Sequence, residues 1–393
     1  MIRVGFAPVD GKHWTGGFHY LKNLLTALSL YRPRYIVPVV LCGVDVPNEV
    51  ASALAAIPGV EIQRLSAPVF ASRGWRLAQA LTMGRDPLLY SLVARFHLDA
   101  VFESAEFYGW RLGVAAISWI PDFQHRVLRD HFSFAGYWRR EIGFRVQISA
   151  RRTVMFSSQD CINFCLQHYR VSPDRLTLVR FAVPTARIPD PVTSRAVADR
   201  YGLPSHFFYM PNQFWRHKNH LLVLDALALL KKQGAPIMVV ASGKQSDLRH
   251  PDHFAEVQAK IARLRLTNQV RLLGLIPYDD VVSLMCASIA VLNPSLSEGW
   301  STSVEEARAL GVPMLLSDLD VHREQAGCKA TYFDRYSAQS LADALRQFEA
   351  PSDTVRQQMA VAAHVDSQER VLQFAADFEA AVRQAVAFAS RRG

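Results

Sequence analysis

The sequence predicts an α/β fold of two domains, each built on a parallel β-sheet, and three observations support this. The 393 residues exceed the ~250–300 residues over which a single hydrophobic core grows. Short apolar runs alternate with helical segments along the chain, which is the order typical of parallel sheets. Residues 289–311 have the sequence of a buried strand, a polar loop with a glycine and the start of a helix, an order that forms anion sites in open α/β sheets.

The first half of the chain alternates strand and helix patterns from its beginning. Strands are expected at 2–8, 35–41, 100–103, 115–120, 154–156 and 176–179, and helices at 18–30, 47–56, 87–96 and 161–169. The proline-rich segment 181–192 loses this periodicity and predicts a linker. We therefore expect domains of residues 1–185 and 186–393, with C-terminal helices that can pack back on the first domain.

Two loops of the first half are candidate binding segments. Gly16 and Gly17 precede a helix, where a missing side chain lets a ligand approach the backbone, although a plain tight turn explains them as well. Their spacing is not GxGxxG, so the dinucleotide fingerprint is absent. Asp122 and His125 follow the strand 115–120, at the carboxyl edge of the sheet. Asp122 is the first choice for a group that orients a hydroxyl of a bound substrate, and His125 is the second. The structural alternative for Asp122 is an Asx turn.

The second half repeats the same alternation. Strands are expected at 207–210, 237–241, 270–273, 289–292 and 314–316, and a helix at 221–232. A further helix is expected to begin at Ser301, Thr302 and Ser303, whose hydroxyls suit an N-cap, and to stop at Gly311, which is followed by Val312 and Pro313.

Charge is distributed unevenly between the two halves. Residues 1–185 contain 21 Lys and Arg against 13 Asp and Glu, whereas the remainder contains 23 against 22. The first half is therefore expected to meet an anionic partner and the second to bind something compact. Helix-turn-helix, zinc-finger and aromatic RNA-binding signatures are missing from the sequence, so no nucleic-acid partner is predicted.

A cytoplasmic location is expected. No apolar run approaches the ~18–20 residues of a spanning helix, and the first residues lack a signal peptide's leader. The five cysteines show no paired spacing, so we expect them to be reduced. Residues 132–152 interleave aromatic and basic side chains and could lie on an anionic membrane surface; the alternative is a solvated helix whose aromatics face the core. The basic members are Arg139, Arg140, Arg145, Arg151 and Arg152, and the aromatic members are Phe134, Tyr137, Trp138 and Phe144.

Two carboxylates with seven residues between them, Glu298 and Glu306, flank the predicted anion site. Carboxylates do not suit phosphates, but they accept hydrogen bonds from the hydroxyls of a sugar or a ribose on either side of a diphosphate. The alternative is a solvated Glu298 and a Glu306 that complements the helix dipole. The Glu-x7-Glu spacing follows Pro294-Ser295, and Gly and Ala follow the two glutamates. This pattern resembles the signature of retaining family 4 glycosyltransferases of the GT-B fold.

The resemblance implies a GT-B fold, in which two Rossmann-like domains have parallel sheets that face a central cleft, and it implies roles for particular residues. Glu298 would bind the donor sugar, Glu306 the ribose, and Lys218 the diphosphate. Arg216 lies near the place of a family arginine, which is Gln213 here, and the family's catalytic His corresponds to Pro121. The resemblance assigns the diphosphate to the backbone of Gly299, Trp300, Ser301, Thr302 and Ser303, and the nucleobase to the backbone of Gly274 and Ile276. Gly16 and Gly17 correspond to the first glycine loop of the family.

The activity implied by the resemblance is transfer of a hexose from a nucleoside-diphosphate sugar to a saccharide or lipid-linked acceptor, with retention of configuration. The pathway would be surface polysaccharide or lipopolysaccharide biosynthesis, in the cytoplasm and peripherally at the inner membrane face. No metal or other cofactor is expected, because no Asp-x-Asp pair or His cluster of the sequence offers a convincing metal site; fixed cations would stabilise the departing diphosphate. Two alternatives stay open: a GT-B nucleotide-sugar epimerase and a catalytically idle sugar-nucleotide-binding subunit.

Overall fold

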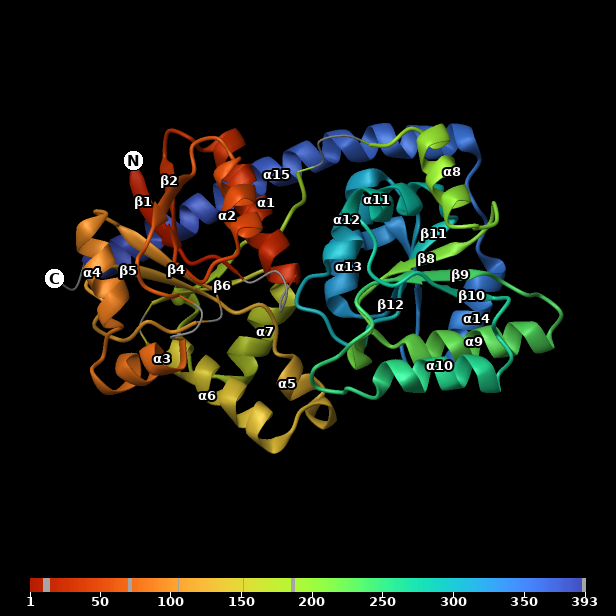
Figure 1. The fold of residues 1–393 in the computed structure, drawn as a ribbon, viewed down its shortest axis with the longest axis horizontal. Helices are drawn as coiled ribbons and strands as arrows, with labels where there is room; N and C mark the ends of the chain where they lie inside the picture. The colour runs from red at the N-terminus through yellow and green to blue at the C-terminus, as the bar shows by residue number, and fades with distance from the viewer. Residues whose placement is uncertain (10–14, 70–72, 105, 151, 185–187, 391–393) are drawn as a thin grey trace. The chain divides into compact units, whose positions relative to one another are not determined.

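The computed structural model describes residues 1–9, 15–69, 73–104, 106–150, 152–184 and 188–390 (Figure 1). These residues form two parallel β-sheets, one of seven and one of six strands, which confirms the predicted α/β class. The chain divides into two units. The first comprises Met1–Phe123, Phe134–Pro184 and Glu369–Gly393, and the second comprises Gln124–Ser133 and Thr185–Gln368.

The sheet of the first unit has the strand order β3-β2-β1-β4-β5-β6-β7, and all neighbouring strands are parallel. Two consecutive strands, β4 and β5, pair over five residues each, from Ala100 opposite Ala115 to Ser104 opposite Trp119. The strands of this sheet are β1 (Ile2–Phe6), β2 (Ile36–Cys42), β3 (Glu61–Arg64), β4 (Ala100–Ser104), β5 (Ala115–Trp119), β6 (Thr153–Phe156) and β7 (Leu176–Leu178).

Helices connect these strands, and side-chain caps begin two of them. Asp86 accepts a hydrogen bond from the Leu89 amide at 3.1 Å, and Ser158 accepts one from the Cys161 amide at 3.2 Å. The short 3-10 turns are Arg129–His131 and Pro173–Arg175, and the helices are α1 (Thr15–Tyr31), α2 (Asn48–Ala55), α3 (Arg73–Thr82), α4 (Pro87–Arg95), α5 (Gln124–Val127), α6 (Phe134–Ser149) and α7 (Gln159–His168).

The second unit has a sheet with the order β10-β9-β8-β11-β12-β13, again parallel throughout. Its strands are β8 (Phe208–Pro211), β9 (Val239–Ser242), β10 (Val270–Leu272), β11 (Ala290–Asn293), β12 (Met314–Ser317) and β13 (Ala330–Phe333). Its helices are α8 (Pro191–Arg200), α9 (His220–Lys232), α10 (His253–Arg263), α11 (Tyr278–Ala287), α12 (Thr302–Leu310), α13 (Asp320–Ala326) and α14 (Ala338–Gln347), with 3-10 turns at Arg216–Lys218 and Gly327–Lys329.

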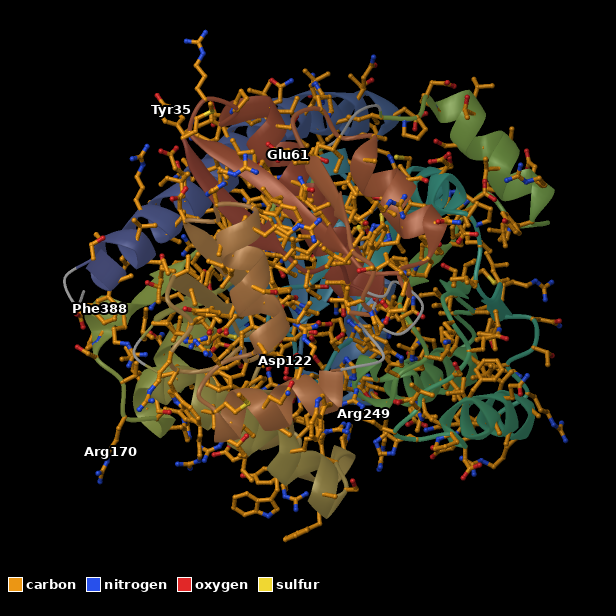
Figure 2. All side chains as sticks on the ribbon, turned by 60° about the vertical axis from the view of Figure 1, so that its left-hand side comes forward. Tyr35, Glu61, Asp122, Arg170, Arg249 and Phe388 are labelled. Atoms are coloured by element: carbon orange, nitrogen blue, oxygen red, sulfur yellow. The ribbon has the colours of Figure 1, made fainter. Side chains whose placement is uncertain are left out.

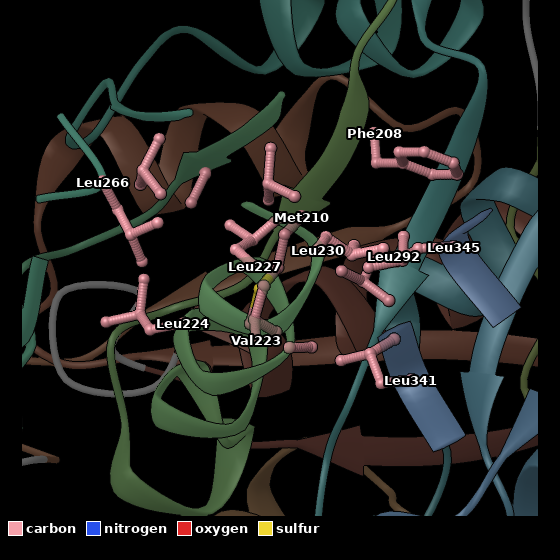
Figure 3. Packing of buried hydrophobic residues seen from close by; sticks show 14 of the residues in the cluster. Phe208, Met210, Val223, Leu224, Leu227, Leu230, Leu266, Leu292, Leu341 and Leu345 are labelled. Atoms are coloured by element: carbon pink, nitrogen blue, oxygen red, sulfur yellow. The ribbon is translucent and has the colours of Figure 1, made fainter. Parts of the chain in front are cut away.

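Alternating side chains of the second sheet supply two cores, one on each face. Phe208 and Met210 pack with α9, α10 and α14, whereas Tyr209 between them packs with α8, α11 and α12. Figure 3 shows Leu227 and Leu230 of α9 gathered with Leu341 and Leu345 of α14 around the first of these cores. Because both faces are covered, most residues of these strands are apolar.

The sequence predicted C-terminal helices that can pack back on the first domain but not the bounds of the final helix, α15 (Asp353–Ser390). Its residues up to Gln368 belong to the second unit and those from Glu369 onward belong to the first. In the first unit, Phe374 lies edge-on to Tyr20 with ring centroids 5.8 Å apart, and Phe378 lies 5.7 Å from Phe102. The C-terminal turns of α15 therefore complete an aromatic core on the first sheet.

Candidate functional site

The strand order of the second sheet reverses between β8 and β11, which lie side by side at its centre. At such a switch point the loops that leave the two carboxyl ends separate in opposite directions, and ligands bind between them. Here the loop after β8 contains the turn Arg216–Lys218, and the loop after β11 leads to α12. Both segments that the sequence singled out in this half therefore leave the sheet at the position where open α/β folds bind ligands.

Hydrogen bonds join these two loops to each other. The Leu296 amide donates to the His217 carbonyl at 2.8 Å, and Asn219 Nδ2 donates to the Pro294 carbonyl at 3.1 Å. Asn219 has φ of 59°, a left-handed conformation that asparagine tolerates better than most residues. Its Nδ2 also donates to the Arg335 carbonyl at 3.0 Å, so the start of α9 is tied to the ends of two strands. The backbones on either side of the switch point are therefore held at a fixed separation.

Lys218 and Glu298 contact each other across this junction. Lys218 Nζ donates to Glu298 Oε1 at 2.5 Å, and the two side chains are only 12% and 10% exposed. Among the ion pairs of the described residues, Glu298 has Lys218 as its basic partner and no other. The structure thus brings together the two residues that the sequence analysis proposed for the diphosphate and the donor sugar.

Asn293, the last residue of β11, organises the loop that follows. Its Oδ1 accepts hydrogen bonds from the amide and the hydroxyl of Ser295, and its Nδ2 donates to Ser301 Oγ at 2.8 Å. From α13, the Gln325 amide group accepts from the Ser301 amide and donates to the Ser301 carbonyl, both at 3.0 Å. The loop is therefore preorganised by buried amide and hydroxyl groups.

The start of α12 is correct in position but differs in detail from the prediction. Ser301 is the N-cap residue, yet its hydroxyl turns toward Asn293 and makes no capping bond. Thr302 and Ser303 occupy the first turn, where amides lack an intrahelical acceptor and the helix dipole favours an anion. Gly299 is buried and Trp300 is partly exposed. The helix ends at Gly311 as predicted, with φ of 69°.

Glu306 lies in α12, partly exposed, and Tyr278 at the start of α11 donates a hydrogen bond to its Oε1 at 3.0 Å. Burial raises the pKa of Glu306 to about 7, and the bond from Tyr278 opposes this shift. Glu306 therefore exchanges its proton near neutral pH. The sequence analysis did not identify Tyr278, although it lies two residues after the Gly274–Ile276 segment, at the start of a helix.

A buried histidine lies close enough to the ion pair to feel both of its charges. Burial lowers the pKa of His322 to about 4, while the Glu298 carboxylate raises it and the Lys218 ammonium lowers it. His322 Nδ1 lies 3.0 Å from the Ser317 carbonyl, which suits a donating Nδ1–H. The imidazole is therefore neutral at neutral pH and does not compete with Lys218 for Glu298. Its place after β12 was the only sequence signal for it.

The loops after β9 and β10 contain the remaining candidates of this unit. Gly243 donates its amide to the Gly274 carbonyl at 2.8 Å, and Gly274 has φ of 70°. Ile276 packs partly against the core. Gln213 Oε1 accepts from the Lys244 amide at 2.8 Å, so its side chain braces a neighbouring loop. Arg216 is exposed, and its amide donates to Asp247.

The candidate site residues of the first half lie after β5 and in the helices α5 and α1. Asp122, labelled in Figure 2, follows β5 and lies 3.4 Å from Arg140 of α6. His125 is buried in α5, within the segment that groups with the second unit. Gly16 and Gly17 lie in the first turn of α1 instead of in the loop before it, because the helix begins at Thr15. The rest of the predicted loop, residues 10–14, lies outside the described residues.

The basic segment is helix α6, and only part of it faces solvent. Arg139 and Arg145 are exposed, whereas Arg152 is buried against Glu103; Arg151 lies outside the described residues. Phe144 is buried, as the core-facing alternative expected, but Phe134 and Trp138 are 73% and 43% exposed. Ile142 extends this exposed apolar row at a spacing of four residues, so one face of α6 is apolar and basic together.

The described residues contain neither a candidate metal cluster nor a helix that could span a membrane. In this part of the chain, His, Cys, Asp and Glu side chains nowhere gather in groups of three or more that could hold a metal ion. None of the helices in the same ranges combines the length and the hydropathy that crossing a membrane requires.

Comparison with known proteins gives a family-model match within the second unit. Residues 202–364 match the family model described as glycosyl transferases group 1. A glycosyltransferase from Rickettsia africae is 14% identical, with a TM-score of 0.72 and 98% of each chain covered. HepE of Anabaena, solved with UDP and glucose, is 18% identical, with a TM-score of 0.70 over 96% of this chain and 98% of its own.

A third similar structure is WaaG, a glycosyltransferase involved in lipopolysaccharide biosynthesis. It is 15% identical, with a TM-score of 0.61 over 97% of this chain and 98% of its own. At these identities the likeness concerns the fold. The chain has the GT-B fold, with its two parallel-sheet α/β domains, as the resemblance predicted.

Proposed function

We propose that this protein is a retaining glycosyltransferase of family 4 that transfers a hexose from a nucleoside-diphosphate sugar to a saccharide or lipid-linked acceptor. The observation that carries the proposal is the Lys218–Glu298 pair beside the start of α12, at the switch point of the unit that matches the glycosyltransferase model. UDP and glucose in the similar HepE structure support a nucleotide-sugar donor.

Donor binding would use three features of the second unit. The first-turn amides of α12 and the Lys218 ammonium would hold the diphosphate, because both offer positive charge without a metal. Glu298 would accept hydroxyls of the transferred sugar, and Glu306 with Tyr278 those of the ribose. The backbone near Gly274 and Ile276 would contact the nucleobase. As the bond to the sugar breaks, Lys218 and the helix start would stabilise the negative charge that develops on the diphosphate.

The acceptor would be oriented by a residue of the loop after β5, with Asp122 first and His125 second. Asp122 is the better candidate because it is partly exposed, whereas His125 is buried. We place the work of the enzyme in surface polysaccharide or lipopolysaccharide synthesis, at the inner face of a membrane, for two reasons. WaaG, a similar structure, takes part in lipopolysaccharide synthesis, and α6 presents apolar and basic side chains together.

The decisive experiment has two stages. A panel of UDP-, GDP-, ADP- and CDP-sugars should contain one family that raises the thermal unfolding temperature, because a ligand that binds the native state alone stabilises it by mass action. With that donor, release of nucleoside diphosphate should depend on an acceptor, the product should keep the anomeric configuration of the donor, and EDTA should not abolish turnover. The proposal would be refuted if no member of the panel raised the thermal unfolding temperature.

A catalytically idle sugar-nucleotide-binding subunit is the second candidate. One observation favours it: Pro121 stands where the resemblance expects a catalytic His. Stabilisation by a nucleotide sugar without acceptor-dependent release of nucleoside diphosphate would support this candidate. Interconversion of nucleotide sugars without an acceptor would support an epimerase.

A further inference from the structure

We infer that Glu298 is an internal counter-ion of Lys218 which the diphosphate of an incoming nucleotide displaces, so that donor binding itself frees the Glu298 carboxylate for the sugar. This inference rests on the proposed function and concerns the regulation of the same site. It predicts an unusual sign: removing a carboxylate from the binding site strengthens the binding of the nucleoside diphosphate.

The first step of the argument is the geometry of the pair. Lys218 Nζ and Glu298 Oε1 are 2.5 Å apart, and both side chains are nearly buried. A charge in such a place is costly unless it is paired, so neither group can simply swing into solvent. Lys218 can leave Glu298 only if another anion takes the place of the carboxylate.

The second step is the rigidity of the surrounding backbone. The bond from the Leu296 amide to the His217 carbonyl and that from Asn219 Nδ2 to the Pro294 carbonyl flank the pair on both loops. The loops therefore cannot separate to release the ion pair. Exchange must occur through the side chains, because the lysine has a long flexible stem and three donors, and Glu298 has two further rotatable bonds beyond its Cβ.

The third step is the charge balance. A diphosphate carries more negative charge than one carboxylate, and the start of α12 adds amides and a helix dipole that attract the same anion. The diphosphate therefore competes for Lys218 from a favourable position. Each exchange replaces one ion pair with another, and it leaves the Glu298 carboxylate available to accept hydrogen bonds from sugar hydroxyls, which replace the lysine as donors.

The test measures dissociation constants of UDP and GDP by calorimetry for wild type, Glu298→Gln, Lys218→Met and the double variant. For whichever nucleotide binds wild type, Glu298→Gln should bind about tenfold more tightly, the scale of one charge-assisted hydrogen bond that no longer has to be broken. Lys218→Met should bind more weakly, and Glu298→Gln should give no gain in the Lys218→Met background. Uridine and guanosine, which lack the diphosphate, should bind all four proteins equally.

Asp225→Asn is the matched control. Asp225 pairs with Lys260 at 2.6 Å in the same unit, between α9 and α10, so its replacement also removes a carboxylate from a lysine and changes the net charge equally. We expect no change in UDP or GDP binding for this variant. Glu298→Asp, which keeps the charge but shortens the side chain, should fall between wild type and Glu298→Gln and provides a second measurement if Glu298→Gln unfolds.

Three outcomes would overturn the inference while leaving the proposed function intact: equal or weaker binding by Glu298→Gln, an equal gain in the Lys218→Met background, or the same gain in Asp225→Asn. Failure of wild type to bind UDP, GDP or any sugar nucleotide of the panel would instead overturn the proposed function, and the inference with it.

Discussion

Each unit has a nearly buried ion pair near the centre of its sheet, and the two pairs differ in how many other groups hold them. In the first unit, Glu103 of β4 accepts hydrogen bonds from Arg152, from Ser118 Oγ and from the Tyr108 amide. Arg152 also donates to the Gly109 carbonyl and lies over the Phe107 ring. In the second unit, the hydrogen bonds of the described residues give Glu298 only Lys218.

The difference separates a pair that stabilises the fold from one that can be exchanged. A carboxylate with three donors from three segments ties those segments together, and losing one donor leaves a buried charge. A carboxylate with a single donor can change partner without disturbing the backbone. Burial and distance alone do not distinguish the two cases, because both pairs are close and shielded from solvent.

The largest expected effect tests the first pair. Arg152→Ala should lower the free energy of unfolding by about 3–5 kcal/mol, because it leaves Glu103 buried with its charge uncompensated. Urea denaturation measures this. Arg346→Ala, which removes the exposed pair between Arg346 and Asp343, should change stability by no more than about 0.5 kcal/mol. A loss below about 1 kcal/mol for Arg152→Ala would mean that the first pair is not structural.

The next effect tests the second pair. Lys218→Ala should lower turnover by the equivalent of about 2–4 kcal/mol of transition-state stabilisation, because it removes a preorganised charge from the departing diphosphate. Its effect on stability should be smaller than that of Arg152→Ala. Steady-state kinetics with the donor identified by thermal stabilisation gives the rate, and Lys260→Ala is the matched lysine control. A rate within a factor of a few of wild type would show that Lys218 is a structural lysine.

Glu306 offers an intermediate effect that depends on pH. Its folded-state pKa of about 7 lies above the ordinary value of 4.5, so the native state holds a proton that the unfolded state has lost between these values. Stability from this group is present at low pH and is lost as pH rises through 7. Between pH 5 and pH 8 the free energy of unfolding of wild type should therefore fall by about 1–3 kcal/mol relative to that of Glu306→Gln, which has no carboxyl group to ionise.

The measurement is urea denaturation of both proteins across that range. Asp343→Asn, at an exposed pair, should follow wild type at every pH. A constant difference between wild type and Glu306→Gln would show that the carboxyl group ionises at its ordinary pKa. Because the ribose is assigned to Glu306, Glu306→Ala should also weaken nucleotide binding. Glu298→Ala should instead lower turnover and, like Glu298→Gln, bind the nucleoside diphosphate more tightly.

The smallest expected effect concerns the surface of α6 in the first unit. Replacing Arg139 and Arg145 with Gln should weaken binding to anionic vesicles by about 1 kcal/mol per arginine at low salt, and by less as salt rises. Arg170→Gln, at an exposed site outside α6 and labelled in Figure 2, is the control and should bind like wild type. Nucleotide binding should be unchanged in all variants. Co-sedimentation that does not depend on these arginines would contradict a basic membrane surface.

The sequence predicted the fold class and the segments that form the candidate site, because both depend on local patterns. Apolar runs marked most strands, and Gly311 marked a helix end correctly. Glu298 and Glu306 were found from their spacing, and Lys218 from the resemblance. The contact between Lys218 and Glu298 was not, because 80 residues separate them and only the pairing of β8 with β11 brings their loops together.

Other features could not be predicted for the same reason. Tyr278 and His322 belong to the candidate site because of residues on other elements. Tyr278 donates a hydrogen bond to Glu306, and the charges of Lys218 and Glu298 act on His322. Arg152 looked like a member of a basic surface, yet burial against Glu103 gives it a structural role. The burial pattern of α15 was difficult to predict because the two parts of the helix belong to different units.

The course of α15 also has a consequence for how the protein is made. Tyr20 and Phe102 emerge early in synthesis, but Phe374 and Phe378, which complete their aromatic core, emerge last. Domains usually fold in the order in which the ribosome produces them. Here the first unit must wait, with part of its apolar surface uncovered, until Glu369–Gly393 has left the ribosome, whereas the second unit has all of its residues before then. The unit that begins first is thus the one that can finish only after all residues of the second unit have been translated.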